Sequence, residues 1–326
     1  MASYLTETSI LCHKNDDVRP AKQCSSVVYL FSFIMLYKIK RYVNISQNDQ
    51  TQERIPSAFM RKILFFLVLA IFSGGCDMQN KFLYFPNDDR PSTQMLASEK
   101  MELWQTEGSD YRGLVSAGNK PAPGGTIVLF HGNGGTAFDR GFYLEPLSEL
   151  GFRVVLAEYP QYGGRPGRVG EKSFVADGLE TVRIVHERYG DPLYLLGESL
   201  GCGVAAAVAR QTKVPIAGII LITPWDTLAA VAKSLFPFLP VKLVLTDKYD
   251  SISNLQSFQK NISVVGAERD EILPIKHAHN LYANLPEGKK RMWVIKGAGH
   301  NDWPFYAGEN LWREMTDFVR VDKKGS

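Results

Sequence analysis

From residue 92 onward, short apolar runs alternate with longer amphipathic stretches. This alternation is typical of an α/β sheet in which a helix crosses back over the sheet after each strand. Strands of a parallel sheet are covered on both faces, so they are expected as continuous apolar runs. The runs that fit lie at 125–130, 152–157, 192–196, 217–222, 262–265 and 291–295. Two weaker runs, at 101–106 and 111–116, predict an entering hairpin.

Helical spacing of apolar residues predicts the segments between the strands. Helices are expected at 138–150, 170–189, 200–211, 275–284 and 304–319. The pattern breaks at 225–260, where a Pro-punctuated stretch (F-P-F-L-P at 236–240) forms no strand–helix unit between the sixth and seventh strands. No linker-like segment divides the body. We therefore expect a single α/β domain over 76–326, with a mostly parallel sheet flanked by helices and a small cap insertion around 225–260.

Composition and charge narrow the possible partners. Hydrophobic residues make up 45% of the 326 residues and charged residues 22%, as in ordinary globular proteins. Residues 1–75 hold 9 basic and 5 acidic residues, and the remainder holds 28 and 29. A nearly neutral body lacks the basic footprint that nucleic-acid binding requires. We expect no nucleic-acid partner and a monomer.

The first 75 residues are expected to lie outside the fold. An apolar run at 27–37 is too short to span a bilayer as a helix. A second segment, 60–75, has a basic start, an apolar stretch at 63–72 and the small residues S-G-G, which is the layout of a secretory signal peptide. Because Met60 opens a complete signal, 1–59 is interpreted as an upstream extension; a genuine cytoplasmic tail is the alternative.

Cys76 follows the small residues directly and resembles the lipidated cysteine of a bacterial lipobox. One departure is Ser73, because lipoboxes usually carry an aliphatic residue three positions before the cysteine. The alternative is an uncleaved anchor helix in which Cys76 is incidental. Both interpretations tether the body to a membrane, and the lipobox predicts a lipoprotein of the bacterial cell envelope that faces the periplasm or the exterior. Cys202 then has no disulfide partner.

The strongest chemical signal is G-E-S-L-G at 197–201. It lies directly after an expected strand and directly before an expected helix, which is the context of a G-x-S-x-G nucleophile turn. Such a turn is strained, and its glycines let the neighbouring backbones approach. Ser199 is therefore the candidate nucleophile.

Five motifs in this order resemble those of the α/β-hydrolase superfamily, specifically its serine aminopeptidase and lysophospholipase-like group, which includes lipases and protein depalmitoylases. They are H-G-N-G-G at 131–135, E-Y-P-Q-Y-G-G at 158–164, G-E-S-L-G, D-E-I-L-P at 270–274 and G-A-G-H-N-D at 297–302. The second motif departs from the family's D-Y-R-G-Y-G by Glu158 for Asp and Pro160 for Arg. These changes are expected to alter a structural loop and not the triad. The resemblance covers 81–320 and is specific for fold and mechanism but not for substrate.

The resemblance implies the partners of Ser199. A serine needs a base and an orienting carboxylate, which follow it in the order Asp/Glu, then His. Of the six histidines, His300 alone lies in the loop beyond the last strand, where the family keeps its base. Asp270 is the preferred carboxylate because D-x-I-x-P resembles the family's turn. Glu268 and Glu271 are expected in solvent.

The resemblance also implies an oxyanion hole built from two backbone amides. One belongs to Leu200, the residue after the nucleophile, and the other to Asn133 in the H-G-N-G-G loop. His131 is interpreted as a structural residue that holds this loop by hydrogen bonds.

These features predict a membrane-tethered serine hydrolase that cleaves carboxylic esters through an acyl-enzyme intermediate. A serine peptidase with the same triad and a non-catalytic binding protein on a hydrolase scaffold are the alternatives; the complete triad argues against the second. No cofactor is expected, and no metal, because the histidines lack ligand spacing such as H-E-x-x-H. The substrate is expected to be a small acyl ester or a lipid-like molecule.

The cap insertion bears on the substrate. Its apolar residues could hold an acyl chain beside the nucleophile, or they could simply pack the cap onto the core. They are Trp225, Leu228, Val231, Leu235, Phe236, Phe238, Leu239, Val241, Leu243 and Val244.

Overall fold

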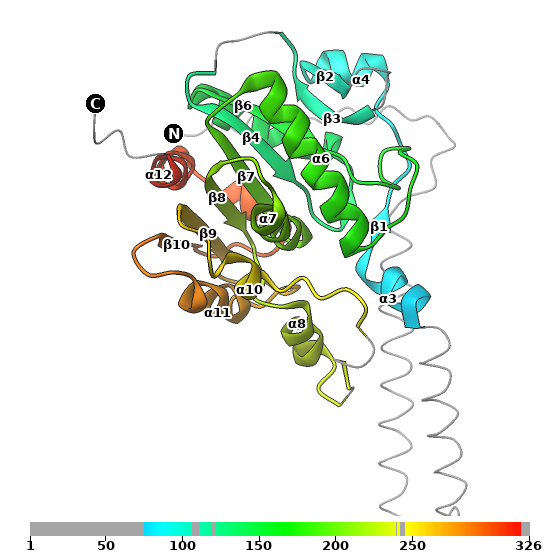
Figure 1. Cartoon of the computed structure of the whole chain (residues 1–326), viewed down its shortest axis with the longest axis vertical. Helices are drawn as coiled ribbons and strands as arrows, with labels where there is room; N and C mark the ends of the chain where they lie inside the picture. The colour runs from blue at the N-terminus through cyan, green and yellow to red at the C-terminus, as the bar shows by residue number, and fades with distance from the viewer. Residues whose placement is uncertain (1–74, 106–110, 119–121, 239, 242–244, 321–326) are drawn as a thin grey trace, which may run out of the picture. The chain divides into compact units, whose positions relative to one another are not determined.

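A central sheet of eight strands carries the fold (Figure 1). The computed structural model describes residues 75–105, 111–118, 122–238, 240–241 and 245–320, and all of these belong to one compact unit. The extension at 1–59 and nearly all of the signal segment at 60–75 lie outside the described residues. The strands of the sheet are β2 (Met101–Gln105), β3 (Tyr111–Ser116), β4 (Gly125–Phe130), β6 (Phe152–Ala157), β7 (Leu193–Glu198), β8 (Ile216–Ile222), β9 (Asn261–Ala267) and β10 (Lys290–Ile295).

The sheet has the order β10-β9-β8-β7-β4-β6-β3-β2. The pairs from β10 to β6 are parallel, whereas β3 pairs antiparallel with both β6 and β2. The predicted hairpin and the mostly parallel sheet are thus confirmed. Every described residue of β4 and β7 is buried, as their continuous apolar sequences predict.

Helices cover both faces of the sheet. One apolar cluster contains buried residues of α6 (Glu171–Tyr189), α7 (Leu200–Gln211), α10 (Ser251–Leu255) and α11 (Lys276–Asn284). The other face packs on α4 (Thr93–Ser98), α5 (Leu144–Glu149) and α12 (Glu309–Val319). Two layers of helices around a parallel sheet are the expected α/β architecture.

Two of the predicted helices are interrupted. The segment 138–150 divides into a 3₁₀ helix, η1 (Phe138–Tyr143), and α5, because Pro146 has no N–H to continue the ladder of an α-helix. The segment 304–319 divides into η2 (Trp303–Tyr306) and α12, with Gly308 extended between them at φ −79° and ψ 166°. The apolar periodicity continues across both breaks and therefore does not reveal them.

Part of the insertion at 225–260 packs on the core. Its helix α8 (Leu228–Leu235) begins at Thr227, whose hydroxyl accepts a hydrogen bond from the amide of Ala230 at 3.0 Å. Among its described apolar side chains, those that are buried are Trp225, Leu228, Val231, Val241, Tyr249 and Leu255.

Three further apolar residues of the insertion do not pack on the core. Leu235 and Phe236 are about half exposed, at 54% and 51%, and Phe238 is 97% exposed. The expectation that the apolar residues pack the cap onto the core is therefore wrong for these three. Leu239, Leu243 and Val244 lie outside the described residues.

The described chain begins with α3 (Gly75–Leu83), which contains Cys76. It leads into β1 (Phe85–Pro86), which pairs in parallel with β5 (Gly134–Gly135). The start of the body is thus joined to the loop that follows β4.

Candidate active site

Ser199 lies in a strained turn between β7 and α7. Its φ of 52° and ψ of −115° are rare for a residue with a side chain. Two glycines make the turn possible. A Cβ on Gly201 would lie 1.9 Å from the carbonyl oxygen of Phe130, and one on Gly197 would lie 2.5 Å from Cα of Cys202. The turn places Ser199 between the last residue of β7 and the first residue of α7, as the motif predicts.

Three side chains from distant parts of the sequence form a chain of hydrogen bonds. Nε2 of His300 lies 2.9 Å from Oγ of Ser199, and Nδ1 of His300 lies 2.7 Å from Oδ2 of Asp270. With Asp270 ionised, Nδ1 carries the proton and donates to the carboxylate, which leaves Nε2 to accept the hydroxyl proton. The structure thus brings together the three residues that the sequence selected, each about 8% exposed.

The Asp270 carboxylate is held by its own turn. Its Oδ1 accepts hydrogen bonds from the amides of Ile272 at 3.0 Å and Leu273 at 2.6 Å. These two amides fix the orientation of the carboxylate. Because Oδ1 is engaged here, Oδ2 is left for His300.

The two other carboxylates of this region have different partners. Glu268 pairs with Nζ of Lys296 at 2.8 Å and accepts from the amide of Gly297 at 2.9 Å, and the Lys296 hydrogen bond lowers the pKa of Glu268. Glu271 is exposed and accepts from the backbone amide of His300 at 3.3 Å. Glu268 and Glu271 thus fasten the His300 loop and do not contact its imidazole.

The H-G-N-G-G loop lies against the nucleophile. A Cβ on Gly132 would be 3.6 Å from Cβ of Ser199. Leu200 is the first residue of α7, where an amide has no acceptor within the helix. Among the described residues, no hydrogen bond occupies the Asn133 amide. Both amides named in the sequence are therefore available near Ser199.

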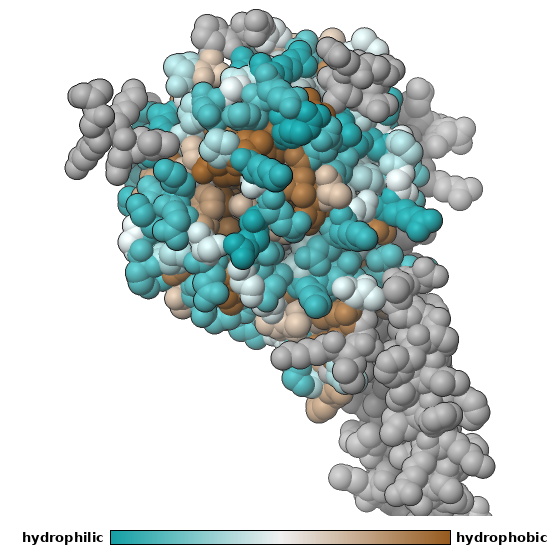
Figure 2. Space-filling view, viewed as in Figure 1, coloured by the Kyte–Doolittle hydropathy of each residue, from teal (hydrophilic) through white to brown (hydrophobic). Residues whose placement is uncertain are grey.

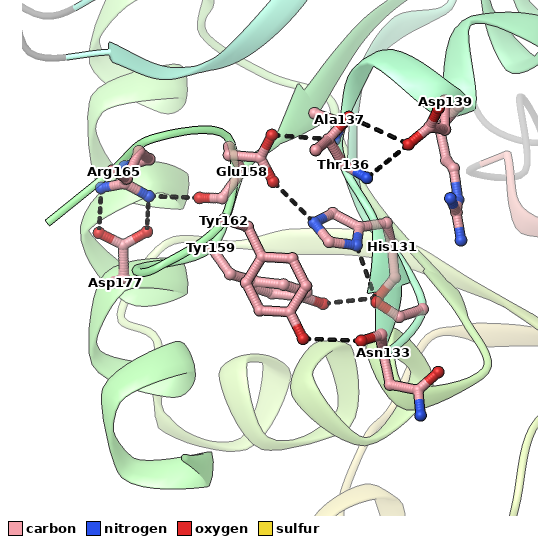
Figure 3. Close-up of polar contacts among 12 residues, drawn as sticks. His131, Asn133, Thr136, Ala137, Asp139, Glu158, Tyr159, Tyr162, Arg165 and Asp177 are labelled. Atoms are coloured by element: carbon pink, nitrogen blue, oxygen red, sulfur yellow. Dashed lines mark hydrogen bonds and ion pairs between the residues drawn. The ribbon is translucent and has the colours of Figure 1, made fainter. Parts of the chain in front are cut away.

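The loop is held by side chains of the 158–164 motif (Figure 3). His131 is fully buried, with Nε2 2.9 Å from Oε1 of Glu158 and Nδ1 2.8 Å from the carbonyl oxygen of Gly132. Tyr159 donates to the carbonyl of His131 at 2.8 Å, and Tyr162 donates to that of Asn133 at 2.7 Å. His131 has the structural contacts that the sequence predicted for it.

Glu158, one of the two departures from the family pattern, is fully buried and lies at the centre of this network. Its Oε2 accepts from the amide of Ala137 at 3.0 Å and from the Tyr111 hydroxyl at 3.3 Å. Its backbone carbonyl accepts from Arg165, which also forms a bidentate ion pair with Asp177 at 2.8 Å (Figure 3). The altered loop therefore supports the H-G-N-G-G loop directly.

A partly buried ion pair adjoins the nucleophile, and the sequence did not reveal it. Nη2 of Arg140 lies 2.9 Å from Oε1 of Glu198, and Tyr143 donates to Oε2 of Glu198 at 2.8 Å. Burial works to lower the pKa of Arg140, but the Glu198 carboxylate more than offsets this and raises it. Burial and the same carboxylate raise the pKa of Tyr143 well above its usual value. Arg140 therefore stays charged and Tyr143 neutral.

Fold and site together define the class of protein. The α/β hydrolase fold family matches residues 125–245. The chain belongs to the α/β-hydrolase superfamily.

Relatives extend over most of the chain. The uncharacterized protein Rv2307c of Mycobacterium tuberculosis is 31% identical over 268 residues, which cover 78% of this chain and 92% of that protein. The uncharacterized protein YfhR of Escherichia coli is 22% identical, covering 82% and 95%. A lysophosphatidylserine lipase of Danio rerio is 29% identical over 222 residues, but the match covers only 60% of this chain and 58% of the lipase.

Solved structures agree on the fold. An esterase of Pyrococcus furiosus superposes with a TM-score of 0.55 at 16% identity, covering 73% of this chain and 96% of the esterase. The protein TT1662 of Thermus thermophilus gives a TM-score of 0.51 at 19% identity, covering 67% and 95%.

Two further observations concern the described residues alone. None of their helices combines the length and the apolar character needed to cross a membrane. Cys76 lies in α3, one residue after the start of the described chain.

Proposed function

We propose that this chain is a serine hydrolase that cleaves carboxylic esters through a covalent acyl-enzyme. The observation that carries the proposal is the continuous hydrogen-bonded chain from Ser199 through His300 to Asp270. Nucleophile, base and orienting carboxylate in this geometry are what acyl transfer requires.

In the first step, Ser199 attacks the substrate carbonyl while Nε2 of His300 takes the hydroxyl proton. Asp270 holds the imidazole in position and stabilises its positive charge. The amides of Leu200 and Asn133 donate to the oxyanion that develops, each contributing about 3 kcal/mol to the transition state. His300 then protonates the leaving alcohol.

In the second step, water replaces the alcohol. His300 takes a proton from the water as it attacks the acyl carbon, and the same amides stabilise the second oxyanion. The proton returns to Ser199 as the acid leaves. Because the turn fixes the backbone of Ser199, its Oγ stays beside Nε2 of His300 in both steps.

The proposed substrate is an acyl ester, including lipid esters. The similarity to lysophosphatidylserine lipases supports this class. A panel of p-nitrophenyl esters and aminoacyl p-nitroanilides tests it, with the Ser199→Ala variant as the blank. We expect hydrolysis of the esters that Ser199→Ala abolishes. Turnover confined to the amides would make the chain a peptidase instead.

We also propose that the enzyme is tethered to a membrane of the bacterial cell envelope through a lipid on Cys76. The support is the order of basic, apolar and small residues in 60–75 directly before the cysteine. The mature protein should then begin at Cys76, carry the mass of a diacylglyceryl group and partition into detergent. A mature chain that keeps residues 60–75 without a lipid would contradict lipidation, and Cys76→Ser should block processing.

A further inference from the structure

Three apolar side chains at the end of α8 are left uncovered by the rest of the described chain. Leu235, Phe236 and Phe238, which we call the α8 tip, follow closely in sequence and are 54%, 51% and 97% exposed. Apolar residues are visible on the surface around α8, at the lower right of the body in Figure 2. Exposed apolar clusters of this kind mark interaction sites.

The N-terminal helix α3 is fixed to the segment that follows the α8 tip. Oε1 of Gln79 accepts from the Thr246 amide at 2.7 Å, and Nε2 of Gln79 donates to Oδ2 of Asp247 at 2.8 Å. The hydroxyl of Tyr84, just after α3, donates to the same Asp247 oxygen and lies 3.0 Å from that of Tyr249. These contacts make α3 a fixed part of the body.

The same segment holds the base of α8. The amide of Leu228 donates to the carbonyl of Lys248 at 3.3 Å, and Thr227 pairs with Asp250. Since α8 has 8 residues, it is only about 12 Å long at 1.5 Å per residue. The α8 tip is therefore close to α3, and both lie at the same end of the body in Figure 1.

The N-terminal segment that precedes the described residues is joined to the start of α3. Residues 1–74 precede α3, and the apolar run at 63–72 stops just before Gly75. Whether a lipid on Cys76 or this run holds the chain in a bilayer, the attachment point is the start of α3. The α8 tip must then lie near the bilayer surface.

We propose that the α8 tip inserts into the phospholipid bilayer to which the N-terminus is attached, so that the body docks on the membrane through α8 and α3. This inference rests on the proposed tether. Aromatic and aliphatic side chains favour the boundary between headgroups and acyl chains. Three exposed lysines near this surface can pair with anionic headgroups. They are Lys81 on α3, Lys233 on α8 and Lys248 in the segment that holds the base of α8.

Docking in this way would orient the site. The amide of Ser199 donates to the carbonyl of Ile222 at 2.9 Å, and Ile222 is the last residue of β8, six positions before α8 begins. The nucleophile thus lies at the carboxyl ends of the parallel strands, the end of the sheet from which the chain leads into α8. A lipid ester that leaves the bilayer at the α8 tip would arrive at this end of the sheet.

The test is tryptophan quenching by brominated lipids. The full chain with Phe238→Trp is reconstituted into vesicles of phosphatidylcholine and phosphatidylglycerol, with and without bromine on the acyl chains, and the wild-type emission is subtracted. We expect the added emission to be blue-shifted and mostly lost with brominated lipid. The matched control is Met95→Trp, because Met95 is 45% exposed on α4, at the opposite end of the body in Figure 1, and its emission should not change.

If the protein floats with the vesicles but the emission of Phe238→Trp is not quenched, the α8 tip is not among the acyl chains and the proposal is overturned. The tip would then be covered by something else, such as the chain's own apolar run, or face water. Equal quenching at Met95→Trp, or failure of the full chain to float, would overturn it too. The mass at Cys76 and ester hydrolysis, measured on the same samples, report separately on the proposed function. If both hold while Phe238→Trp stays unquenched, the docking surface alone is wrong.

Discussion

At the scale of single residues, the site depends on a few atoms whose geometry is demanding. Ser199 has a positive φ, which residues with a side chain rarely adopt. Both ring nitrogens of His300 have hydrogen-bond partners, Asp270 and Ser199. The catalytic roles of Ser199 and His300 could be predicted from the sequence, because each residue lies in a short motif of neighbouring residues. The ion pairs that support the site were not predictable, because Glu198 with Arg140 and Glu158 with His131 join positions far apart in sequence. A single sequence carries no signal for such pairs.

The first residue-scale prediction concerns the carboxylate. Asp270→Asn should lower kcat for ester hydrolysis by several orders of magnitude, because an amide cannot hold His300 in the reactive tautomer. Ser199→Ala should lose at least as much. Glu268→Gln is the matched control, since Glu268 contacts Lys296 and not the imidazole. A loss from Glu268→Gln as large as that from Asp270→Asn would contradict the assignment.

The second concerns Cys202, whose Sγ contacts the carbonyls of Gly197 and Ile222. Burial raises the pKa of this thiol well above its usual value. The thiolate, which is the reactive form, is therefore scarce at pH 8. We expect N-ethylmaleimide to leave Cys202 unmodified in the native protein and to modify it after denaturation, as mass spectrometry would detect. Rapid native labelling would mean that the thiol is accessible.

At the scale of elements, the strands were predicted to within about two residues, because strands buried on both faces appear as unbroken apolar runs. The helices were predicted less well. Pro146 and Gly308 interrupt two of them, and the amphipathic period does not register the breaks. The orientation of α8 could not be predicted either, since apolar residues in an insertion can face the core or solvent with the same spacing.

One element-scale prediction concerns the packing of α7 on β4. Gly201→Ala places a methyl group 1.9 Å from the Phe130 carbonyl, so the helix must move away from the strand. We expect a loss of about 3 kcal/mol or more in the free energy of unfolding, or no folded protein. Gly308→Ala is the control: nothing lies within 4 Å of its Cβ, and its effect should stay within about 0.5 kcal/mol. Similar melting temperatures for the two variants would refute the packing argument.

Another concerns the loop beside the nucleophile. Glu158→Ala leaves Nε2 of His131 and the Ala137 amide buried without their acceptor. We expect it to destabilise the protein by about 1–3 kcal/mol per orphaned group and to lower kcat. Glu180→Ala removes an exposed ion pair with Arg183, which should change stability by less than about 1 kcal/mol. Urea unfolding and ester kinetics on both variants give the comparison, and equal stability would count against a supporting role for Glu158.

At the scale of the whole molecule, the fold brings the triad, the loop at 131–135 and the insertion to one edge of the sheet. The order of the five motifs predicted this arrangement, because loops after parallel strands meet at their carboxyl ends. The path of a substrate was not predictable. Ile272, whose backbone amide donates to Asp270, is 40% exposed, whereas Phe238 is 97% exposed.

The prediction at this scale concerns acyl-chain length. We expect kcat/KM for p-nitrophenyl esters to rise from acetate toward medium chains, by about 0.8 kcal/mol for each CH₂ that is buried. Ile272→Ala should flatten the rise, and Phe238→Ala should leave it unchanged. The test is kcat/KM against acyl-chain length for the wild type, Ile272→Ala and Phe238→Ala. A flattened rise in Phe238→Ala would instead show that Phe238 contributes to binding the acyl chain.

The central claim is that Ser199, activated by His300, forms the covalent intermediate. Labelling with a fluorophosphonate followed by peptide mass spectrometry tests it most directly, because only an activated serine reacts quickly. We predict one adduct, on the peptide that contains Ser199, that forms together with the loss of ester hydrolysis and is absent from His300→Ala. An adduct on a different residue, or full ester hydrolysis in a protein that carries no adduct, would contradict the account.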